Sequence, residues 1–224
     1  MNTLNHIAFI MDGNGRWGLR KKKNRNYGHL KGVETVKKIV EASIKLNIPI
    51  VTFYVFSSEN WQRPKSEINY LFKLISSYFR KDINNILRQG IKIKLIGRIK
   101  SLPNKVKKIL HQTLLKTKKN KKIVVNLAIN YGSKNEIIDT IKKLKTNSLK
   151  IGEANIDKFL DLKKPFPDIL IRTGGQKRLS NFLLWQVSYS EIFFIEKLWP
   201  DFNKLDLAKI IKKFKKIKRN FGKI

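Results

Sequence analysis

The sequence predicts a single α/β domain over residues 1–224, with a six-stranded, mostly parallel central sheet flanked by helices. Three observations support this fold class. Short apolar runs alternate along the chain with longer segments whose apolar residues recur at helical spacing. No internal repeat, heptad pattern or Pro/Gly/Ser-rich linker divides the chain. The hydrophobic content of 42% is typical of a globular protein rather than a disordered one.

Six short apolar runs are predicted as strands. The first ends where Ile7–Met11 meets Asp12, and the others show the same change from apolar to polar residues. In chain order they are His6–Met11, Ile50–Ser57, Ile91–Gly97, Ile123–Asn130, Asp168–Thr173 and Glu191–Ile195. Because helical segments separate them, we expect right-handed crossovers that bring the carboxyl ends of the strands to one edge of the sheet.

Helical patterns occupy the intervals between these strands. Pro64 stands where a helix can begin, and Ser133 precedes Glu136 at the spacing of a capping box. The last helix has an apolar stripe that includes Ile210, Ile211 and Phe214. The predicted helices are His29–Leu46, Lys65–Gln89, Pro103–Lys119, Ser133–Lys145, Asn155–Leu160 and Asn203–Lys218.

Polar residues that are unusual for a strand end follow four of the six predicted strands. They are Asp12 after the first, Ser57–Arg63 after the second, Asn130–Gly132 after the fourth and Arg172–Gly175 at the end of the fifth. In an open α/β sheet, ligands bind in the crevice outside the carboxyl ends of the strands. We therefore expect these segments to converge on one site.

The segment Asp12–Trp17 predicts a site for magnesium and a diphosphate. Gly13 and Gly15 allow the backbone N–H groups to approach a phosphate, and the forked guanidinium of Arg16 suits phosphate oxygens. The carboxylate of Asp12 would repel such an anion unless a divalent cation lay between them, which is how Mg²⁺ is commonly held. A tight Asp-Gly or Asn-Gly turn without chemistry is an equally acceptable interpretation of this segment alone.

Five of the ten arginines lie in or beside the predicted edge loops, which would suit two diphosphate groups better than one phosphate. They are Arg16, Arg25, Arg63, Arg172 and Arg178. The alternative is a set of solvated surface arginines, which is strongest for Arg25 because it follows three lysines. Neither a GxxxxGK[ST] loop nor a GxGxxG fingerprint accompanies these arginines, and no HExxH or GxSxG motif is present.

The net charge of +33 raises nucleic-acid binding as a second hypothesis. We expect no nucleic-acid partner, because 39 of the 49 cations are lysines spread over the whole chain and an AT-rich genome would produce the same composition. Without cysteine the chain has no disulfide and no thiolate zinc site. No apolar run is long enough to span a bilayer and no signal peptide is evident, so we expect a cytoplasmic protein.

Taken together, these segments resemble the cis-prenyltransferases, the family of the bacterial undecaprenyl diphosphate synthases (di-trans,poly-cis). The resemblance covers nearly the whole chain and is carried by HIAFIMDGNGRW, RNYGHLKG, FYVFSSENWQRP, NLAINYG, PDILIRTGGQKRLSNFLLWQ and SEIFFIEKLWPDF. It implies Mg²⁺-dependent, sequential cis condensation of isopentenyl diphosphate onto an allylic diphosphate such as farnesyl diphosphate. It also implies a homodimer, a hydrophobic tunnel, and a long-chain product that partitions into the membrane and serves cell-wall synthesis. The chain has no paired DDxxD motifs, which are typical of trans-prenyltransferases.

The resemblance also implies roles for individual residues. Asp12 would hold Mg²⁺ against the diphosphates, and Glu191 would be a further Mg²⁺ ligand that could act at the site of a partner subunit. Asn60 would assist proton removal within the loop of Ser57, Ser58 and Glu59. The allylic diphosphate would contact Gly13, Asn14, Gly15, Arg16, Arg25, His29 and Arg63, with Trp17 and Trp61 at the start of the prenyl path. Isopentenyl diphosphate would contact Arg172, Arg178, Leu179 and Ser180.

Two positions depart from the pattern of the family. Gln176 stands where an acid is usual, and Asn220-Phe221-Gly222 replaces a C-terminal Arg-x-Gly. A third hypothesis, a non-catalytic partner subunit, conflicts with the presence of Asp12, Asn60 and the Arg172–Arg178 segment. The sequence does not fix the length of the product or the dimer interface, for which 182–185 and 192–199 are candidates.

Overall fold

A parallel sheet forms the centre of the computed structural model, which describes residues 2–220. Its strands are β1 (His6–Ile10), β2 (Ile50–Ser57), β3 (Ile91–Ile96), β4 (Ile123–Tyr131), β5 (Ile169–Arg172) and β6 (Glu191–Phe194). Their order across the sheet is β3-β4-β2-β1-β5-β6, and every neighbouring pair is parallel. The predicted fold class and all six predicted strands are confirmed, with ends that differ by at most one residue.

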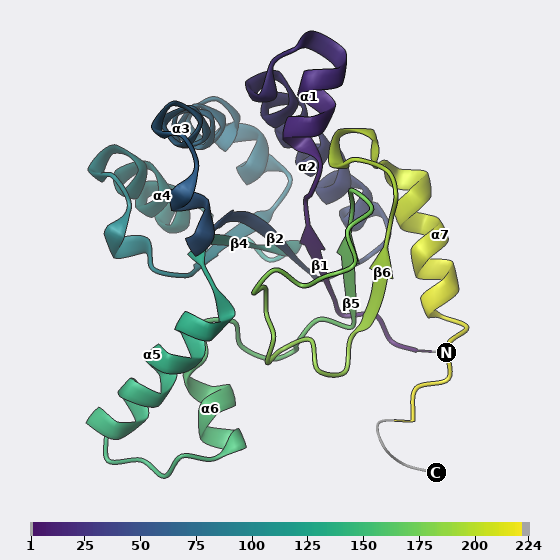
Figure 1. Ribbon diagram of the computed structural model, residues 1–224. Coiled ribbons are helices and arrows are strands. Elements are labelled where there is room, and N and C mark those ends of the chain that lie inside the picture. The colour runs from purple at the N-terminus through teal and green to yellow at the C-terminus, as the bar shows by residue number, and fades with distance from the viewer. Residues whose placement is uncertain (1, 221–224) are drawn as a thin grey trace.

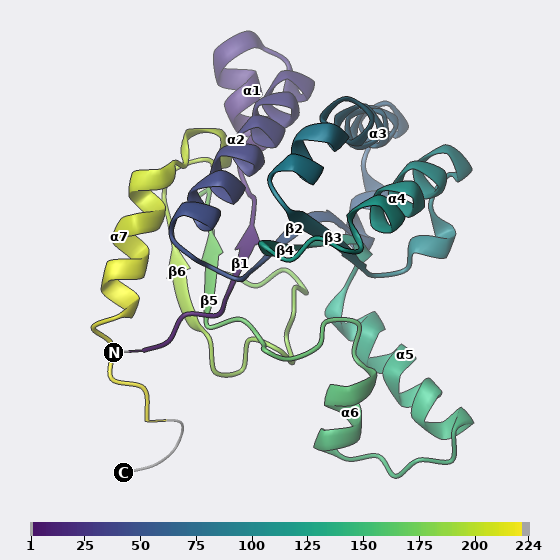
Figure 2. The ribbon, with the colours of Figure 1, turned by 180° about the vertical axis from the view of Figure 1, so that it is seen from behind.

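Two groups of segments cover the two faces of this sheet (Figures 1 and 2). The helices are α1 (Asn14–Lys22), α2 (Arg25–Lys45), α3 (Lys65–Arg88), α4 (Asn104–Thr117), α5 (Ser133–Thr146), α6 (Glu153–Phe159) and α7 (Lys204–Phe214). Helices α2, α3, α4 and α7 supply the core of one face, and Leu162 together with residues 182–187 covers the other. Among the described residues, no helix combines the length and the apolar character that crossing a bilayer requires.

The side chains of β1 alternate between two separate hydrophobic cores. Ile7 and Phe9 of β1 belong to the larger core, under the four helices, whereas Ala8 and Ile10 belong to the smaller one. All four side chains are buried. This alternation follows from the period of two in an extended strand, and it explains why the strands are almost continuously apolar: a parallel sheet is covered on both faces.

The position of β1 in the strand order determines where a ligand can bind. From β1 the chain crosses over to β2 on one side, and β5 later pairs with the other side of β1. The strand order therefore reverses at β1, and a crevice opens at the carboxyl ends of β1 and β5. Asp12 follows the end of β1 and Arg172 ends β5, so the topology places these two residues at the same crevice.

Three details of the sequence-based prediction are wrong. Residues 14–22 form helix α1, although no helix was predicted before His29. Gly132, not Ser133, caps α5: Ser133 Oγ accepts a hydrogen bond from the backbone N–H of Leu184 instead. Phe182 and Leu183, which we considered for a dimer interface, are fully buried in the smaller core. In each case a tertiary contact overrides the local pattern.

Gly28, at the crossing of α1 and α2, is predicted to allow the close packing that positions α1. A Cβ atom at Gly28 would lie 1.8 Å from the carbonyl oxygen of Asn14, a contact that only a shift of the backbone can relieve. We expect Gly28→Ala to lower the free energy of unfolding by roughly 2–4 kcal/mol, because overpacking forces α1 away from α2. Thermal unfolding measures this loss. Gly152→Ala is the matched control, because nothing lies within 4 Å of its added Cβ, and an equal loss in both variants would contradict the prediction.

Candidate active site

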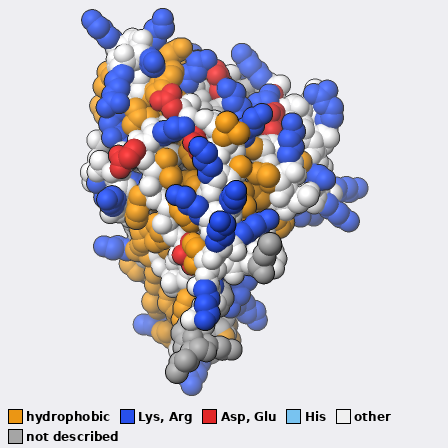
Figure 3. All heavy atoms as spheres, turned by 90° about the vertical axis from the view of Figure 1, so that its right-hand side faces the viewer, with side chains coloured by type: hydrophobic (Ala, Val, Ile, Leu, Met, Phe, Trp, Pro, Cys, Tyr) orange, Lys and Arg blue, Asp and Glu red, His pale blue; other side chains and the backbone are white. Residues whose placement is uncertain are grey.

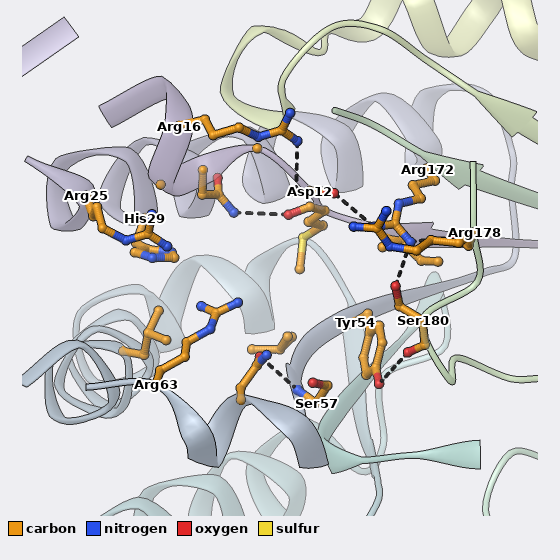
Figure 4. Close-up of a pocket in the computed structure, with 18 residues that line it drawn as sticks. Asp12, Arg16, Arg25, His29, Tyr54, Ser57, Arg63, Arg172, Arg178 and Ser180 are labelled. Atoms are coloured by element: carbon orange, nitrogen blue, oxygen red, sulfur yellow. Dashed lines mark hydrogen bonds and ion pairs between the residues drawn. The ribbon is translucent and has the colours of Figure 1, made fainter. Parts of the chain in front are cut away.

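The crevice at the carboxyl ends of the strands is a pocket of about 350 Å³. Figure 4 shows that side chains from both sides of it point into the same space. The residues that line it are Ile10, Met11, Asp12, Gly13, Asn14, Gly15, Arg16, Arg25, His29, Tyr54, Val55, Ser57, Asn60, Arg63, Leu71, Arg172, Arg178 and Ser180. All five arginines predicted from the edge loops are among them, and Asp12 is the one acid in this lining. The pocket is therefore suited to a ligand with several negative charges.

Asp12 is held between two of these arginines. Its Oδ1 accepts a hydrogen bond from Arg16 at 3.2 Å, and its Oδ2 accepts one from Arg172 at 2.9 Å (Figure 4). Arg16 also donates to the carbonyl oxygen of Gly174 at 2.8 Å. Gly174 has a φ of +88°, and a Cβ there would lie 2.6 Å from the Arg16 guanidinium, so only glycine permits this approach.

The first turn of α1 presents backbone N–H groups to the pocket. Gly13 precedes the helix in the left-handed conformation and offers no side-chain cap, and the first turn contains no acid. The N–H groups at the start of a helix have no partner within the helix, and the helix dipole favours an anion beside them. The turn formed by Asn14, Gly15 and Arg16 is therefore suited to an anion next to Asp12.

Glu67 of α3 connects two arginines and a histidine on the opposite side of the pocket. It accepts hydrogen bonds from Arg25 Nε at 3.0 Å, from Arg63 Nη1 at 3.0 Å and from His29 Nε2 at 3.1 Å. The Glu67 side chain is only 9% exposed. Burial by itself raises the Glu67 pKa, but hydrogen bonds from Arg25 and His29 and the charges of the two arginines lower it below its usual value. Burial also lowers the pKa of His29, which is therefore neutral near pH 7.

Gln176 takes over one function expected of the acid that is usual at its position. Its Oε1 accepts a hydrogen bond from Arg178 Nη1 at 2.6 Å, so a neutral acceptor still orients this guanidinium. Arg172 donates to Ser180 Oγ at 2.8 Å and to the carbonyl oxygen of Arg178. The Arg172 side chain is 4% exposed, and its Nε is buried without a hydrogen-bond partner. Such an unsatisfied donor beside the pocket is consistent with a site for an anionic ligand.

The loop after β2 is ordered by its own side chains and by distant ones. Asn60 Oδ1 accepts a hydrogen bond from the backbone N–H of Ser57 at 3.1 Å, which turns the loop into a short 3₁₀ helix. Glu59 accepts one from Asn181 at 2.8 Å, and Trp61 Nε1 donates to Asn130 at 2.8 Å. The loop after β2 is thus connected to the end of β4 and to the segment that follows β5.

Not all predicted site residues line the pocket. Those that do not are Trp17, Ser58, Glu59, Trp61, Leu179 and Glu191. Trp17 stacks on Tyr27 and donates its Nε1–H to Asp201 at 2.7 Å, and Trp61 packs against Phe56 and Phe72. Both indoles therefore lie at the periphery of the site in this structure. Tyr54 and Val55 line the pocket but were not assigned to it from the sequence, where they are indistinguishable from core residues of β2.

Glu191 is the clearest departure from the predicted site. It begins β6 and pairs in register with Ile169 at the start of β5, so it lies at the amino end of the sheet. Its neighbour there is Arg219, at 3.7 Å. Within one chain, parallel pairing separates Glu191 from Asp12, and a shared metal site in the same subunit is excluded. A role at the site of a partner subunit stays a prediction.

The altered C-terminal motif extends to Phe221 and Gly222, outside the described residues.

A second, apolar cavity of about 110 Å³ continues from the polar pocket between the sheet, α2 and α3. Five residues line both spaces: Met11, Asn14, His29, Val55 and Leu71. Beyond them the walls are apolar, with Val36, Leu74, Ile75, Phe79 and Trp199 among the lining residues. A charged site and a hydrocarbon-lined cavity therefore meet at one mouth.

The donor set of the pocket fits a magnesium ion that is held partly by its substrate. No cluster of three or more His, Asp or Glu side chains is found among residues 2–220, so a metal held only by protein ligands is not supported. The Asp12 side chain is 27% exposed and faces a cationic pocket. One carboxylate plus phosphate oxygens is a common coordination for Mg²⁺, which leaves Asp12 as the residue that would hold it.

Comparisons with known proteins agree with this geometry. The family model described as "Putative undecaprenyl diphosphate synthase" matches residues 10–222. Isoprenyl transferases of Rickettsia sibirica and Wolinella succinogenes are 42% and 43% identical over 225 residues, covering 100% of this chain and 100% and 99% of theirs.

Two solved structures share the fold over essentially the whole chain. A probable undecaprenyl diphosphate synthase from Campylobacter jejuni is 37% identical with a TM-score of 0.87, and covers 100% of both chains. Lavandulyl diphosphate synthase from Lavandula x intermedia, solved with dimethylallyl diphosphate, is 31% identical with a TM-score of 0.94, and covers 99% of both. From its sequence, its fold and the pocket at its switch point, the chain belongs to the undecaprenyl diphosphate synthase family of prenyltransferases.

Proposed function

We propose that this chain is a Mg²⁺-dependent enzyme that adds isopentenyl diphosphate units in cis geometry to an allylic diphosphate such as farnesyl diphosphate. Its product would be a long-chain polyprenyl diphosphate, with undecaprenyl diphosphate for cell-wall synthesis as the specific product. One observation carries the proposal: a pocket with five arginines and Asp12 opens directly onto an apolar cavity. Such a site matches a substrate with a diphosphate head and a hydrocarbon tail.

The two sides of the pocket suit the two diphosphates. Following the family resemblance, the allylic diphosphate would lie against the first turn of α1 and the Glu67 group of Arg25, His29 and Arg63. Isopentenyl diphosphate would lie against Arg172, Arg178 and Ser180. The tail of the allylic substrate would then enter the apolar cavity past Met11, Val55 and Leu71, three of the residues common to both spaces.

In each condensation the allylic C–O bond breaks, a new C–C bond joins the two isoprenoid units, and a proton leaves the added unit. The departing diphosphate gains negative charge, which Arg16, Arg25 and Arg63 are placed to stabilise. The neutral carboxamide of Asn60 is a poor base, so the departing diphosphate is the better proton acceptor. Asn60 would then orient that diphosphate. Mg²⁺ held by Asp12 would supply further neutralisation of the diphosphate oxygens.

A product assay tests the proposal directly. The purified chain is incubated with farnesyl diphosphate, labelled isopentenyl diphosphate and Mg²⁺, and the products are separated by length. We expect a polyprenyl diphosphate with several added units, and eleven isoprene units in total if the product is undecaprenyl. A folded protein that forms no elongated product would refute the proposed activity.

We further propose a homodimer that forms along the exposed edge of β6. Ile192 and Phe194 on this edge strand are 39% and 37% exposed, and Tyr189 beside them is 65% exposed. Figure 3 views the side of the molecule with β6 and α7, where hydrophobic patches lie among Lys and Arg side chains. An unpaired edge with large apolar side chains is typical of an interface. Sedimentation should show a dimer that Ile192→Lys dissociates, and a wild-type monomer would contradict this proposal.

The proposed reaction also defines where the protein acts and what it does not bind. We propose a cytoplasmic enzyme, peripheral at the inner face of the membrane, that passes its lipid product to the bilayer and has no nucleic-acid partner. Filter binding at two salt concentrations tests the last point. Tight RNA binding with a steep salt dependence would contradict it.

A further inference from the structure

A second concave surface lies on the far side of the wall that bounds the apolar cavity. It is a groove of about 520 Å³ between α3 and α4, two helices that run side by side in Figures 1 and 2. Its lining contains four cations and no acid: Arg80, Lys105, Lys108 and Lys116. Its remaining residues include the apolar side chains of Phe79, Ile83 and Ile109.

The groove lies beside the longest stretch of the chain without an acidic residue. Residues 83–135 contain 14 Lys and Arg and not a single Asp or Glu. Asp82, the nearest acid in sequence, forms an ion pair with Lys37 of α2 at 3.2 Å. The groove therefore has no internal countercharge and favours an anionic partner.

One residue lines both this groove and the proposed prenyl cavity. Phe79 lines both spaces and is only 5% exposed. Leu115 borders the same side of α4, seven residues after Lys108, and is 60% exposed. Lysines around an exposed leucine are typical of surfaces that rest on a bilayer, with the charges at the headgroups and the apolar side chain below them.

We propose that the α3–α4 groove docks on an anionic phospholipid bilayer and so places the far end of the prenyl cavity against the membrane. The importance of this for product transfer rests on the proposed function, but the docking itself does not. Lysine, a compact charge without a planar fork, suits a mobile lipid headgroup surface better than base-specific readout of a nucleic acid. The apolar floor beside the lysines fits acyl chains and would be unused on a phosphate backbone.

Vesicle binding with matched charge reversals tests this proposal. The triple variant Lys105→Glu/Lys108→Glu/Lys116→Glu changes the groove, and Lys209→Glu/Lys212→Glu/Lys213→Glu on α7 makes the same change in net charge elsewhere. We expect wild type to sediment with vesicles containing phosphatidylglycerol but not with phosphatidylcholine alone. The groove variant should lose about a hundredfold in affinity, and the α7 variant at most a few-fold. Equal losses in both variants would overturn the proposal, because overall charge would then explain binding.

A fluorescence measurement places the surface itself. Leu115→Trp should shift its emission to the blue when anionic vesicles are added, whereas Lys209→Trp should not. Vesicle binding without that shift would show that another face docks and would overturn the proposal. The proposal would also be overturned if wild type bound RNA but not vesicles and the groove variant no longer bound RNA. Both binding assays can be done with the Asp12→Asn variant, because they do not require catalysis. A failure of the proposed enzyme activity would instead appear in the product assay, which contains no vesicles.

Discussion

Replacing Asp12 by asparagine is expected to lower the rate of chain elongation by about a thousandfold. The change keeps the size of the side chain and one hydrogen-bond acceptor for the arginines, but it removes the one acid in the lining of the pocket. Stabilisation of developing charge by a metal ion contributes several kcal/mol, and roughly 4 kcal/mol corresponds to a factor of about a thousand. Single-turnover rates with farnesyl diphosphate and isopentenyl diphosphate, measured over a series of Mg²⁺ concentrations, provide the readout.

The Mg²⁺ series separates loss of the metal from loss of structure. Asp12 also neutralises Arg172, whose side chain is almost fully buried, so Asp12→Asn carries a stability cost. Misplaced arginines alone would leave a lower rate with the Mg²⁺ dependence of wild type, whereas loss of the metal ligand leaves a residual rate that responds weakly to Mg²⁺. Asp139→Asn, which removes an exposed pair with Arg98, is the control and should behave like wild type. An Asp12→Asn enzyme with the wild-type rate and Mg²⁺ titration would overturn the metal assignment.

The sheet and the location of the site could be predicted because both depend on local, repeated signals. Apolar runs define buried strands, and parallel connectivity then requires their carboxyl ends to share an edge. Because the strand ends share an edge, the sequence alone predicts that Asp12, Arg63 and Arg172, from three distant segments, lie at the same site. The same reasoning identified Arg25 as a candidate, although its position after three lysines favours a solvated surface arginine. In the structure Arg25 lines the pocket instead, because Glu67 holds it there by a hydrogen bond.

The parts that were missed depend on partners far away in the sequence. Helix α1 has two glycines and a cluster of charges in nine residues, so it lacks an apolar period, and its packing on α2 stabilises it. The indole N–H groups of Trp17 and Trp61 bond to Asp201 and Asn130, which no local pattern reveals. Glu191 was assigned to the metal site by resemblance alone, although the predicted strand Glu191–Ile195 already begins with it; its register with Ile169 places it at the amino end of the sheet, away from Asp12. The continuity between the polar pocket and the apolar cavity is likewise a property of three-dimensional packing.

Glu67 shows how a buried acid can support a site made for anions. A carboxylate near two diphosphates would be unfavourable unless nearby cations outweigh it, and here the two guanidinium groups of Arg25 and Arg63 outweigh a single negative charge, while neutral His29 adds a hydrogen bond. Both oxygens of Glu67 are engaged, while the remaining guanidinium N–H groups of the two arginines can face the pocket. The acid therefore fixes the positions of cations that come from the start of α2 and from the turn before α3. Because these two helices also form the walls of the apolar cavity, the same contacts hold its mouth in place.

Glu67→Gln is expected to raise the KM for the allylic diphosphate by about tenfold to a hundredfold and to leave the KM for isopentenyl diphosphate nearly unchanged. The neutral amide keeps the shape of the side chain but turns one acceptor into a donor that faces Arg25, Arg63 and His29. Hydrogen bonds between charged groups contribute about 1.5–3 kcal/mol each, which sets the size of the effect. Steady-state kinetics with each substrate varied in turn measures the split. Glu34→Gln, which removes an exposed pair with Lys31, is the matched control.

The same substitution has a predicted dependence on pH. The Glu67 pKa is lowered in the folded protein, so its charge stabilises the fold above the unfolded pKa of about 4.5, and this contribution is lost as the pH falls through the folded pKa. Wild type should therefore be more stable than Glu67→Gln at neutral pH, by about 1–3 kcal/mol. The difference should shrink in acid below about pH 4.5, because protonated Glu67 resembles glutamine. A gap in unfolding free energy that stays constant from neutral pH into acid, or equal increases of both KM values, would show that Glu67 does not position the cations of the allylic site.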